Sequence, residues 1–241
     1  MKKSIIIILL FTSFIFAQSE NQIGWIAKFG GAGGFSPIIL FPNFDDINAN
    51  ITQLGMKELS GPIYAWGGGG YAYVMIIDNL RVGGIGFSGL QSETSNVNGF
   101  DNEVVYSLGG GAATIEYTMP FVKNMALSAG IMIGGGSLDI DIYQNSGKVN
   151  WNNIWQKVIE NENDDNKNYS LSNSFFLISP TVNIDVPVNR FIAIRAGLGY
   201  QFTLGSNWES ANGKQLNNVP SSFNGDGFFI QTGIYIGLFA F

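Results

Sequence analysis

The chain has 241 residues and a formal net charge of −6, and it contains neither histidine nor cysteine. The missing cysteine excludes disulfides and thiolate metal sites, and the missing histidine removes the commonest general base and metal ligand. The acidic balance argues against nucleic acid as a partner. Charged residues make up only 12% of the chain while glycine contributes 32 residues, which departs from the composition of an average globular domain.

The first segment has the layout of a secretory signal peptide. Lys2 and Lys3 precede an apolar stretch over residues 5–16, and Ala17 is a small residue after which cleavage could follow. We therefore expect a signal peptide over 1–17 and a single mature domain over 18–241. An uncleaved N-terminal anchor is the alternative. No cysteine follows the apolar stretch, so attachment as a bacterial lipoprotein is excluded.

The expected mature domain has no apolar run of about 18 residues, so no membrane-spanning helix is predicted. Two classes remain for an exported chain of this composition. One is a secreted soluble all-β protein, in which a second sheet or a helix would cover each apolar strand face. The other is a transmembrane β-barrel, in which the apolar residues occupy alternate positions facing lipid.

Alternation of apolar and polar residues predicts eight long strands. The clearest is 190–204, where Ile194 and Leu198 lie on the apolar face and Arg195 on the opposite one. Its length suits a membrane-spanning strand, which needs about 9–11 residues. The predicted strands, in chain order, are 22–35, 62–77, 80–91, 103–119, 124–143, 172–187, 190–204 and 227–241.

Within 124–143 the apolar residues change parity after Gly134, which predicts a β-bulge near Gly134–Gly136. Two further segments leave the strand count open. Ten strands are possible if residues 36–41 or 148–153 also pair.

The connections between the predicted strands are of two kinds. Three are tight, and each contains an asparagine that tolerates turn dihedral angles: Asn79, Asn124 and Asn189. They alternate with four mostly longer, polar connections over 36–61, 92–102, 144–171 and 205–226. This asymmetry is typical of outer-membrane barrels, in which short turns face the periplasm and longer loops face outward.

The third long connection contains apolar residues at helical spacing. Ile154, Trp155, Val158 and Ile159 would lie on one side of a short surface helix. An irregular loop with local apolar packing fits the same residues equally well.

The chain ends on the apolar segment "YIGLFAF". With the predicted signal peptide, strand count and turn asymmetry, the chain resembles the eight-stranded outer-membrane β-barrels of Gram-negative bacteria, the OmpA/OmpX-type small barrels. The resemblance implies an all-β fold, an eight-stranded antiparallel transmembrane β-barrel with short periplasmic turns and longer outer loops. It also implies location in the bacterial outer membrane, contact with its lipid, and recognition of Tyr235, Phe239 and Phe241 by the barrel-assembly machinery.

Enzymatic activity is not expected. The phospholipase, palmitoyltransferase, deacylase and protease families of outer-membrane barrels rely on a histidine, and this chain has none. A serine nucleophile would need another base, and no serine is paired with one in the sequence. The glycine runs lack the following helix and the Lys-Ser/Thr pair of a phosphate loop, so no nucleotide or other cofactor is predicted.

The predicted lumen combines small residues with several larger polar ones. An eight-stranded barrel is just wide enough for side chains to fill, and an unpaired buried charge is expensive. We therefore expect Glu116 to pair with Arg195 or Lys28. The predicted polar lumen residues are Lys28, Glu116, Asn183, Asp185, Arg195 and Gln201. They would form either a plug of ion pairs or the wall of a narrow polar path.

Aromatic residues are predicted to mark two interfacial belts. The belt at the predicted periplasmic ends comprises Trp25, Tyr117, Phe121, Phe191, Phe239 and Phe241. The belt at the predicted outer ends comprises Trp66, Tyr106, Phe175, Phe176, Phe228 and Phe229.

The acidic run at 160–166 lacks the spacing of an EF-hand, so it is interpreted as a solvated loop and not as a metal site. The sequence thus favours a non-enzymatic structural or surface-interaction role, with the outer loops as the contact surface. The alternative is a narrow porin-like channel, or a carrier of a small molecule through a glycine-lined lumen.

Overall fold

A computed structural model describes residues 29–74, 76–120, 122, 125–147, 150–160, 166–205 and 207–240. The predicted signal peptide, Lys28 and Phe241 lie outside the described residues. The backbone of Phe239 is described but its side chain is not.

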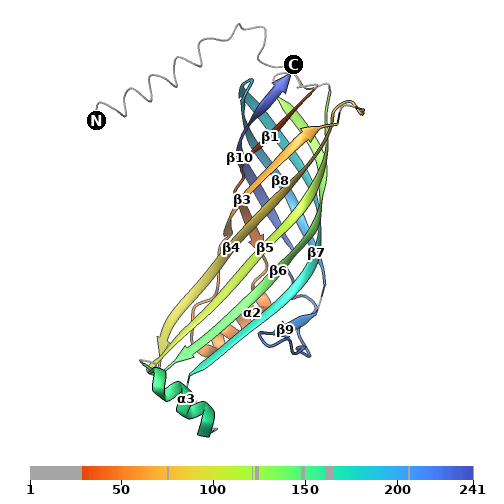
Figure 1. Ribbon diagram of the computed structural model, residues 1–241. Coiled ribbons are helices and arrows are strands. Elements are labelled where there is room, and N and C mark those ends of the chain that lie inside the picture. The colour runs from red at the N-terminus through yellow and green to blue at the C-terminus, as the bar shows by residue number, and fades with distance from the viewer. Residues whose placement is uncertain are drawn as a thin grey trace, which may run out of the picture.

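The described strands form one antiparallel sheet that closes on itself as a barrel (Figure 1). β10 pairs with β8 on one side and with β1 and β2 on the other, which closes the ring. The strands are β1 Phe29–Phe35, β2 Ile38–Pro42, β3 Ile63–Tyr73, β4 Leu80–Val97, β5 Phe100–Thr118, β6 Ala126–Asn145, β7 Lys167–Asn189, β8 Ile192–Leu204, β9 Trp208–Ser210 and β10 Gly227–Ala240.

The ring has eight strand positions among the described residues, as the sequence predicted. β1 and β2 both pair with β10 and with β3, so β2 continues the position of β1 after a short interruption. The segment 36–41, which could have added a strand, therefore extends the first one. β9 pairs with β7 and lies outside the ring. Residues 151–153 of the other optional segment belong to a helix.

The predicted alternation of faces is confirmed along β7 and β8. On β8, Ile194 and Leu198 are about half exposed on the outer surface while Arg195 is buried inside. On β7, Val182 points outward and its neighbour Asn183 is buried. Because strand side chains alternate with period two, one buried arginine fixes the orientation of every other residue on its strand.

The predicted bulge near Gly134–Gly136 is absent. β6 pairs with β5 and with β7 in unbroken register through this region. Ser128 and Leu138 are both buried on the same inner face, so the parity does not change. The polarity of each face changes instead. Along β6 the inner face turns from polar to apolar, while the outer face acquires Asp139 and Asp141. A register shift occurs instead between Pro187 and Asn189 of β7.

The predicted loop over 92–102 is wrong. β4 and β5 continue through it and pair up to Val97 and Phe100. The turn is Asn98-Gly99, with φ of 54° and 84°. Asparagine followed by glycine suits a two-residue hairpin turn because both positions need positive φ, so the local sequence did contain the signal.

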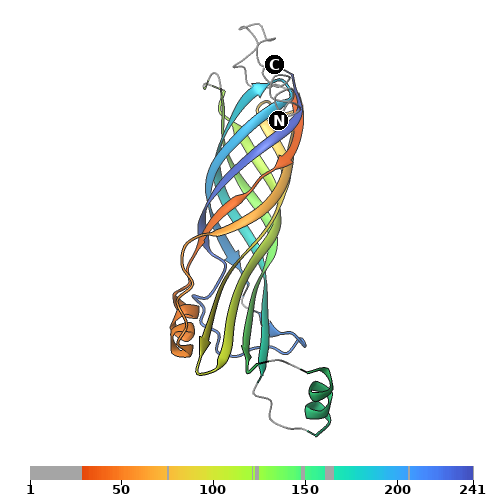
Figure 2. The same ribbon diagram turned by 90° about the vertical axis from the view of Figure 1, so that its left-hand side faces the viewer.

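The strands extend unequally at the two ends of the barrel, as Figures 1 and 2 show. We call the end with the short connections at 74–79, 119–125 and 189–191 the turn end, and the opposite end the loop end. At the loop end β4, β5, β6 and β7 run on beyond the other strands as an open sheet. The segment with α2 Asp45–Ile51 and η1 Thr52–Leu54 lies against this sheet.

An apolar core fills the space between the extended sheet and these connecting segments. Phe44 packs edge-on against Tyr106 of β5 with 5.0 Å between ring centroids, and Trp208 stacks on Phe223 at 5.1 Å. Other fully buried members are Ile51, Leu59, Ile63, Leu108, Leu138 and Leu177.

Three of the aromatic residues predicted for the belt at the loop end therefore point inward. Tyr106, Phe175 and Phe229 are all buried in the apolar core. Trp66, Phe176 and Phe228 of the same predicted belt do face outward, as do Tyr117 and Phe191 near the turn end. The prediction failed for these three because it did not consider which face of the strand each aromatic residue occupies. Without that, a core aromatic and an interfacial aromatic cannot be told apart in the sequence.

The third long connection contains α3 Trp151–Glu160, which resolves the helix alternative in favour of a helix. In both views α3 stands clear of the barrel at the loop end. No helix in the described part of the chain has the length and apolar character needed to cross a membrane.

Candidate functional site

Four charged side chains meet inside the barrel near the turn end. Arg81 of β4 and Glu116 of β5 are cross-strand partners, and so are Asp185 of β7 and Arg195 of β8. All four occupy inward positions of their strands, and each is at most 4% exposed. We call Arg81, Glu116, Asp185 and Arg195 the ionic cluster.

Arg195 binds both carboxylates. Its Nε donates to Asp185 Oδ1 at 2.6 Å and its Nη1 donates to Glu116 Oε1 at 2.9 Å. Its Nη2 also donates to both residues, at 2.9 Å to Asp185 Oδ2 and 3.1 Å to Glu116 Oε2. The ion pair expected between Glu116 and Arg195 is thus present, and Asp185 joins it.

Arg81 completes the cluster from the opposite side. Its Nη2 donates to Glu116 Oε2 and to Ser128 Oγ, each at 2.6 Å, and its Nη1 contacts Asp185 Oδ2. The sequence prediction missed Arg81, although this residue lies within the predicted strand 80–91. Its position beside the apolar, outward-facing Val82 was the available signal.

Tyrosine rings flank the two guanidinium groups. The Cζ atoms of Arg81 and Arg195 lie 4.6 Å and 4.8 Å from the ring centroid of Tyr71. Arg195 also lies 5.0 Å from the ring of Tyr235, and Arg81 lies 5.8 Å from that of Tyr73. Cation–π contact adds most when the charge is desolvated, as it is here.

Tyr235, predicted as part of an assembly signal, is one of these rings and is 2% exposed in the lumen. Its recognition by the barrel-assembly machinery, together with that of Phe239 and Phe241, stays a prediction.

The two amide side chains predicted for the lumen lie in different places. Asn183 joins the ionic cluster, since its Nδ2 donates to Glu116 Oε1 at 3.1 Å. Its side chain lies directly over Gly197, where an added Cβ would collide with Asn183 Oδ1. Gln201 lies further toward the loop end, where its Nε2 donates to the Gly225 carbonyl at 2.8 Å. Of the predicted polar lumen residues, Gln201 is thus buried but is not part of the cluster.

The cluster is electrically balanced, with two guanidinium groups and two carboxylates. A charge removed from water is strongly unfavourable unless it is paired and its hydrogen-bonding capacity is used. Here each carboxylate oxygen accepts from at least one arginine nitrogen. The arrangement can hold four strands together and occlude the lumen.

The chemistry needed for catalysis or metal binding is not assembled in the cluster. Its carboxylates are engaged by arginines, so neither is available as a general base for Ser128. No group of three or more acidic side chains able to hold a metal ion occurs within the described ranges.

An apolar layer lies on the loop-end side of the cluster. Inward side chains of β4 to β7 and β10 become apolar there, with Phe87, Leu108, Leu177 and Phe229 all buried. The barrel interior thus contains an ionic layer near the turn end and an apolar layer toward the loop end.

Comparison with known proteins gave similar structures only. No family model and no curated protein sequence matches the chain. The outer membrane protein OprG from Pseudomonas aeruginosa is 12% identical, with 91% of this chain and 99% of that chain covered and a TM-score of 0.45.

Two further solved structures match this chain with comparable sequence identity, coverage and TM-score. Ail, the attachment invasion locus protein of Yersinia pestis, crystallised with the heparin analogue sucrose octasulfate, is 8% identical, with 88% and 99% covered and a TM-score of 0.43. A major outer membrane protein from Thermus thermophilus is 9% identical, with 86% and 99% covered and a TM-score of 0.40. The assignment of the fold rests on the strand ring and its register.

Proposed function

We propose that this chain is a non-enzymatic integral protein of the bacterial outer membrane, whose closed barrel anchors and presents the loop end for structural or surface-contact roles. The observation that carries the proposal is the succession of two barriers in one lumen. The ionic cluster occupies one level and the apolar layer another, so a solute would have to displace both.

The outer surface supports placement in a membrane. Large apolar side chains are exposed on every strand position of the ring, which would be unfavourable in water but suits lipid. They include Phe35, Val82, Ile115, Ile133, Val182, Ile184, Ile194, Leu198, Ile234 and Ile236. Toward the loop end the outward positions become polar, for example Ser137 and Asp139 on β6 and Ser174 on β7.

The narrow channel is less well supported by this geometry. Conduction through the cluster would require Arg81 or Arg195 to leave two carboxylates at once, because each arginine contacts both Glu116 and Asp185. It would also require the apolar layer to open. Hydrophobic constrictions themselves act as barriers to ions because they do not stay wet.

Single-channel recording in a planar lipid bilayer tests the proposal. The folded protein, verified by its heat-modifiable gel mobility, is expected to give no discrete conductance steps. Arg195→Ala and Glu116→Ala are expected to remain silent as well, because the apolar layer still closes the lumen. Regular conductance steps in the wild type that change with either substitution would contradict the closed barrel and favour the channel.

A further inference from the structure

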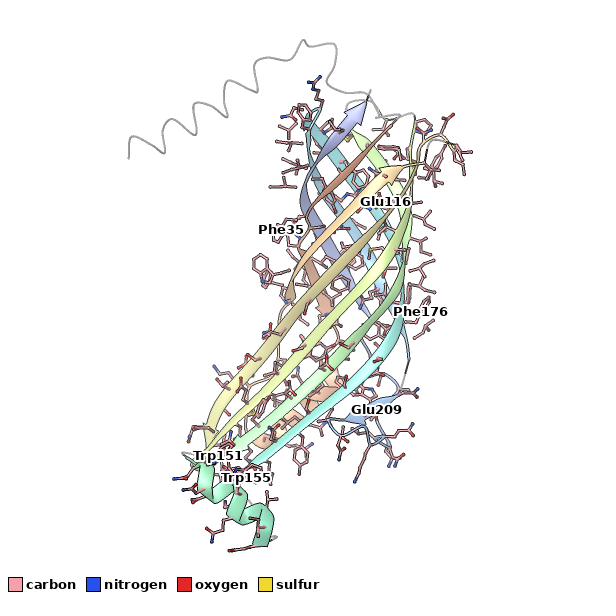
Figure 3. All side chains as sticks on the ribbon, viewed as in Figure 1. Phe35, Glu116, Trp151, Trp155, Phe176 and Glu209 are labelled. Atoms are coloured by element: carbon pink, nitrogen blue, oxygen red, sulfur yellow. The ribbon has the colours of Figure 1, made fainter. Side chains whose placement is uncertain are left out.

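A continuous exposed apolar surface outside the barrel wall belongs to α3. Its exposed large side chains are Trp151, Ile154, Trp155, Val158 and Ile159, with exposures from 40% to 75%. Their spacing of three and four residues places all five on one face of the helix. The rings of Trp151 and Trp155 meet at a centroid distance of 5.7 Å, and Figure 3 shows both at the far tip of the loop end.

No residue of α3 is buried, so this face is not packed into the core formed by the described residues. The opposite face is hydrophilic and carries no net charge, with Asn152, Asn153 and Gln156 beside Lys157 and Glu160. A helix with this division of side chains is suited to lie flat at a boundary between water and an apolar phase.

The position of α3 separates it from the bilayer that would surround the barrel. The outward residues of β6 become polar at Ser137, and the strand continues to Asn145 before α3 begins. Eight residues at about 3.4 Å each, on a strand tilted by about 45°, place the helix roughly 20 Å beyond that boundary. A surface contacted by α3 therefore faces the loop end from outside.

The charge of the loop end restricts which partners could contact α3. The acidic residues at the loop end of the described chain are Asp45, Asp46, Glu58, Glu93, Asp101, Glu103, Asp139, Asp141, Glu160, Glu209 and Asp226. The basic ones there are Lys57, Lys157, Lys167 and Lys214. This excess of negative charge opposes contact with a second copy of the chain and with an anionic lipid surface.

The size and composition of the face favour lipid over protein. Five side chains on a helix of ten residues present a few hundred Å², below the roughly 800 Å² per partner of a stable protein interface. Tryptophan is the residue type most characteristic of the membrane–water interface, and two of the five are tryptophan. Contact with lipid needs no complementary pocket.

We propose that α3 inserts its apolar face into the interface of an electrically neutral, zwitterionic bilayer opposed to the loop end. The assignment of the loop end as the outward side rests on the proposed function. The chain would thereby hold two lipid surfaces close together, one around the barrel and one against α3.

The test uses full-length protein folded into lipid nanodiscs and mixed with separate phosphatidylcholine vesicles. Co-flotation with the vesicles measures binding, and brominated phosphatidylcholine placed only in the vesicles measures quenching of tryptophan fluorescence. Both signals are expected for the wild type. Trp151→Ala with Trp155→Ala is expected to lower vesicle partitioning roughly tenfold or more, because two large apolar side chains are lost. Gln156→Ala, on the hydrophilic face, is the matched control and should leave binding unchanged.

Several results would overturn the proposal. They are equal binding by the wild type and the double variant, quenching only when the brominated lipid is in the nanodisc, stronger binding to phosphatidylglycerol vesicles, or self-association without vesicles. Heat-modifiable mobility and bilayer silence of the same preparations show separately whether the barrel is folded and closed. Failure of vesicle binding with those properties intact refutes only the role of α3.

Discussion

Arg81→Met tests whether the ionic cluster is dry and tightly coupled. Methionine keeps the apolar stem of arginine but removes the charged guanidinium group, leaving Glu116 and Asp185 to share Arg195. Arg81 is fully buried and the two carboxylates are at most 5% exposed by side chain. Removing one partner of such a buried pair costs about 3–5 kcal/mol, since the remaining charge is left uncompensated.

The free energy of unfolding is measured by urea titration of the protein folded in lipid vesicles, with gel mobility as the readout of the folded barrel. The matched variant is Asp185→Asn, and the double variant restores electrical balance inside the lumen. Because the two substitutions affect one contact, their effects should not add, and the double variant should be at least about 1.5 kcal/mol more stable than the sum of the single effects predicts.

Two outcomes would refute this reasoning. Loss of less than about 1 kcal/mol in Arg81→Met would mean that the carboxylates are hydrated, as in exposed ion pairs. A coupling energy near zero between Arg81→Met and Asp185→Asn would mean the same. Either result would show that water reaches the cluster and would weaken the closed-lumen proposal.

Three further substitutions test other features of the fold by the same unfolding measurement or by proteolysis. Leu198→Arg on the apolar outer surface should lose about 2–4 kcal/mol in lipid, whereas Ser174→Arg on the outward face of the loop-end sheet should lose under 1 kcal/mol. Equal losses would place the membrane boundary elsewhere. Gly134→Ala should lose about 1–3 kcal/mol because its Cβ would collide with the Gly111 carbonyl, whereas Gly111→Ala, whose nearest neighbour is 3.7 Å away, should fold normally. A stable Gly134→Ala protein would show that β5 and β6 can separate there. Leu59→Ala, in the apolar core, should lose about 2–5 kcal/mol locally and expose residues 43–61 to protease while the barrel keeps its gel mobility. Unchanged protection would mean that this segment does not depend on the core.

The sequence predicted the strand ring and three of the four members of the ionic cluster because alternation and buried charge are strong signals. On β8, Arg195 interrupts an otherwise small inner face, and no lipid-facing position would accept it. On β5, Glu116 stands between the outward Ile115 and Tyr117. Opposite charges assigned to one narrow lumen must pair, which is why their contact could be expected from the sequence.

Other features of the structure could not be predicted from the alternation of apolar and polar residues. Arg81 lies one residue into its strand, where a turn and a strand start look alike in sequence. The hairpin at Asn98-Gly99 was predictable from its turn residues but not from the surrounding residues, which are polar on both faces. Phe175 and Phe176 are adjacent aromatic residues, of which the first is buried and the second faces outward. Only the register of β7 distinguishes them.

The apparent change of parity on β6 has a physical cause that explains the loop end as a whole. Where a strand crosses lipid, its apolar residues face outward and its interior can hold polar or charged groups, provided that they pair. Where the strand continues into water, the hydrophobic effect places apolar residues inside and polar residues outside. The inner face of β6 therefore passes from Ser128 to Leu138 and Ile140 without a bulge.

The extended part of β4 to β7 is an open sheet, because β3, β8 and β10 do not continue beside it. Its apolar inner face would be exposed to water unless other segments covered it. The first connection supplies Phe44, Ile51 and Leu59 for this purpose, and the last supplies Trp208 and Phe223. The length and apolar content of these two connections follow from the need to close the core beyond the barrel. The apolar residues of α3 remain exposed, so they close no part of this core, and this difference singles α3 out for a contact outside the molecule.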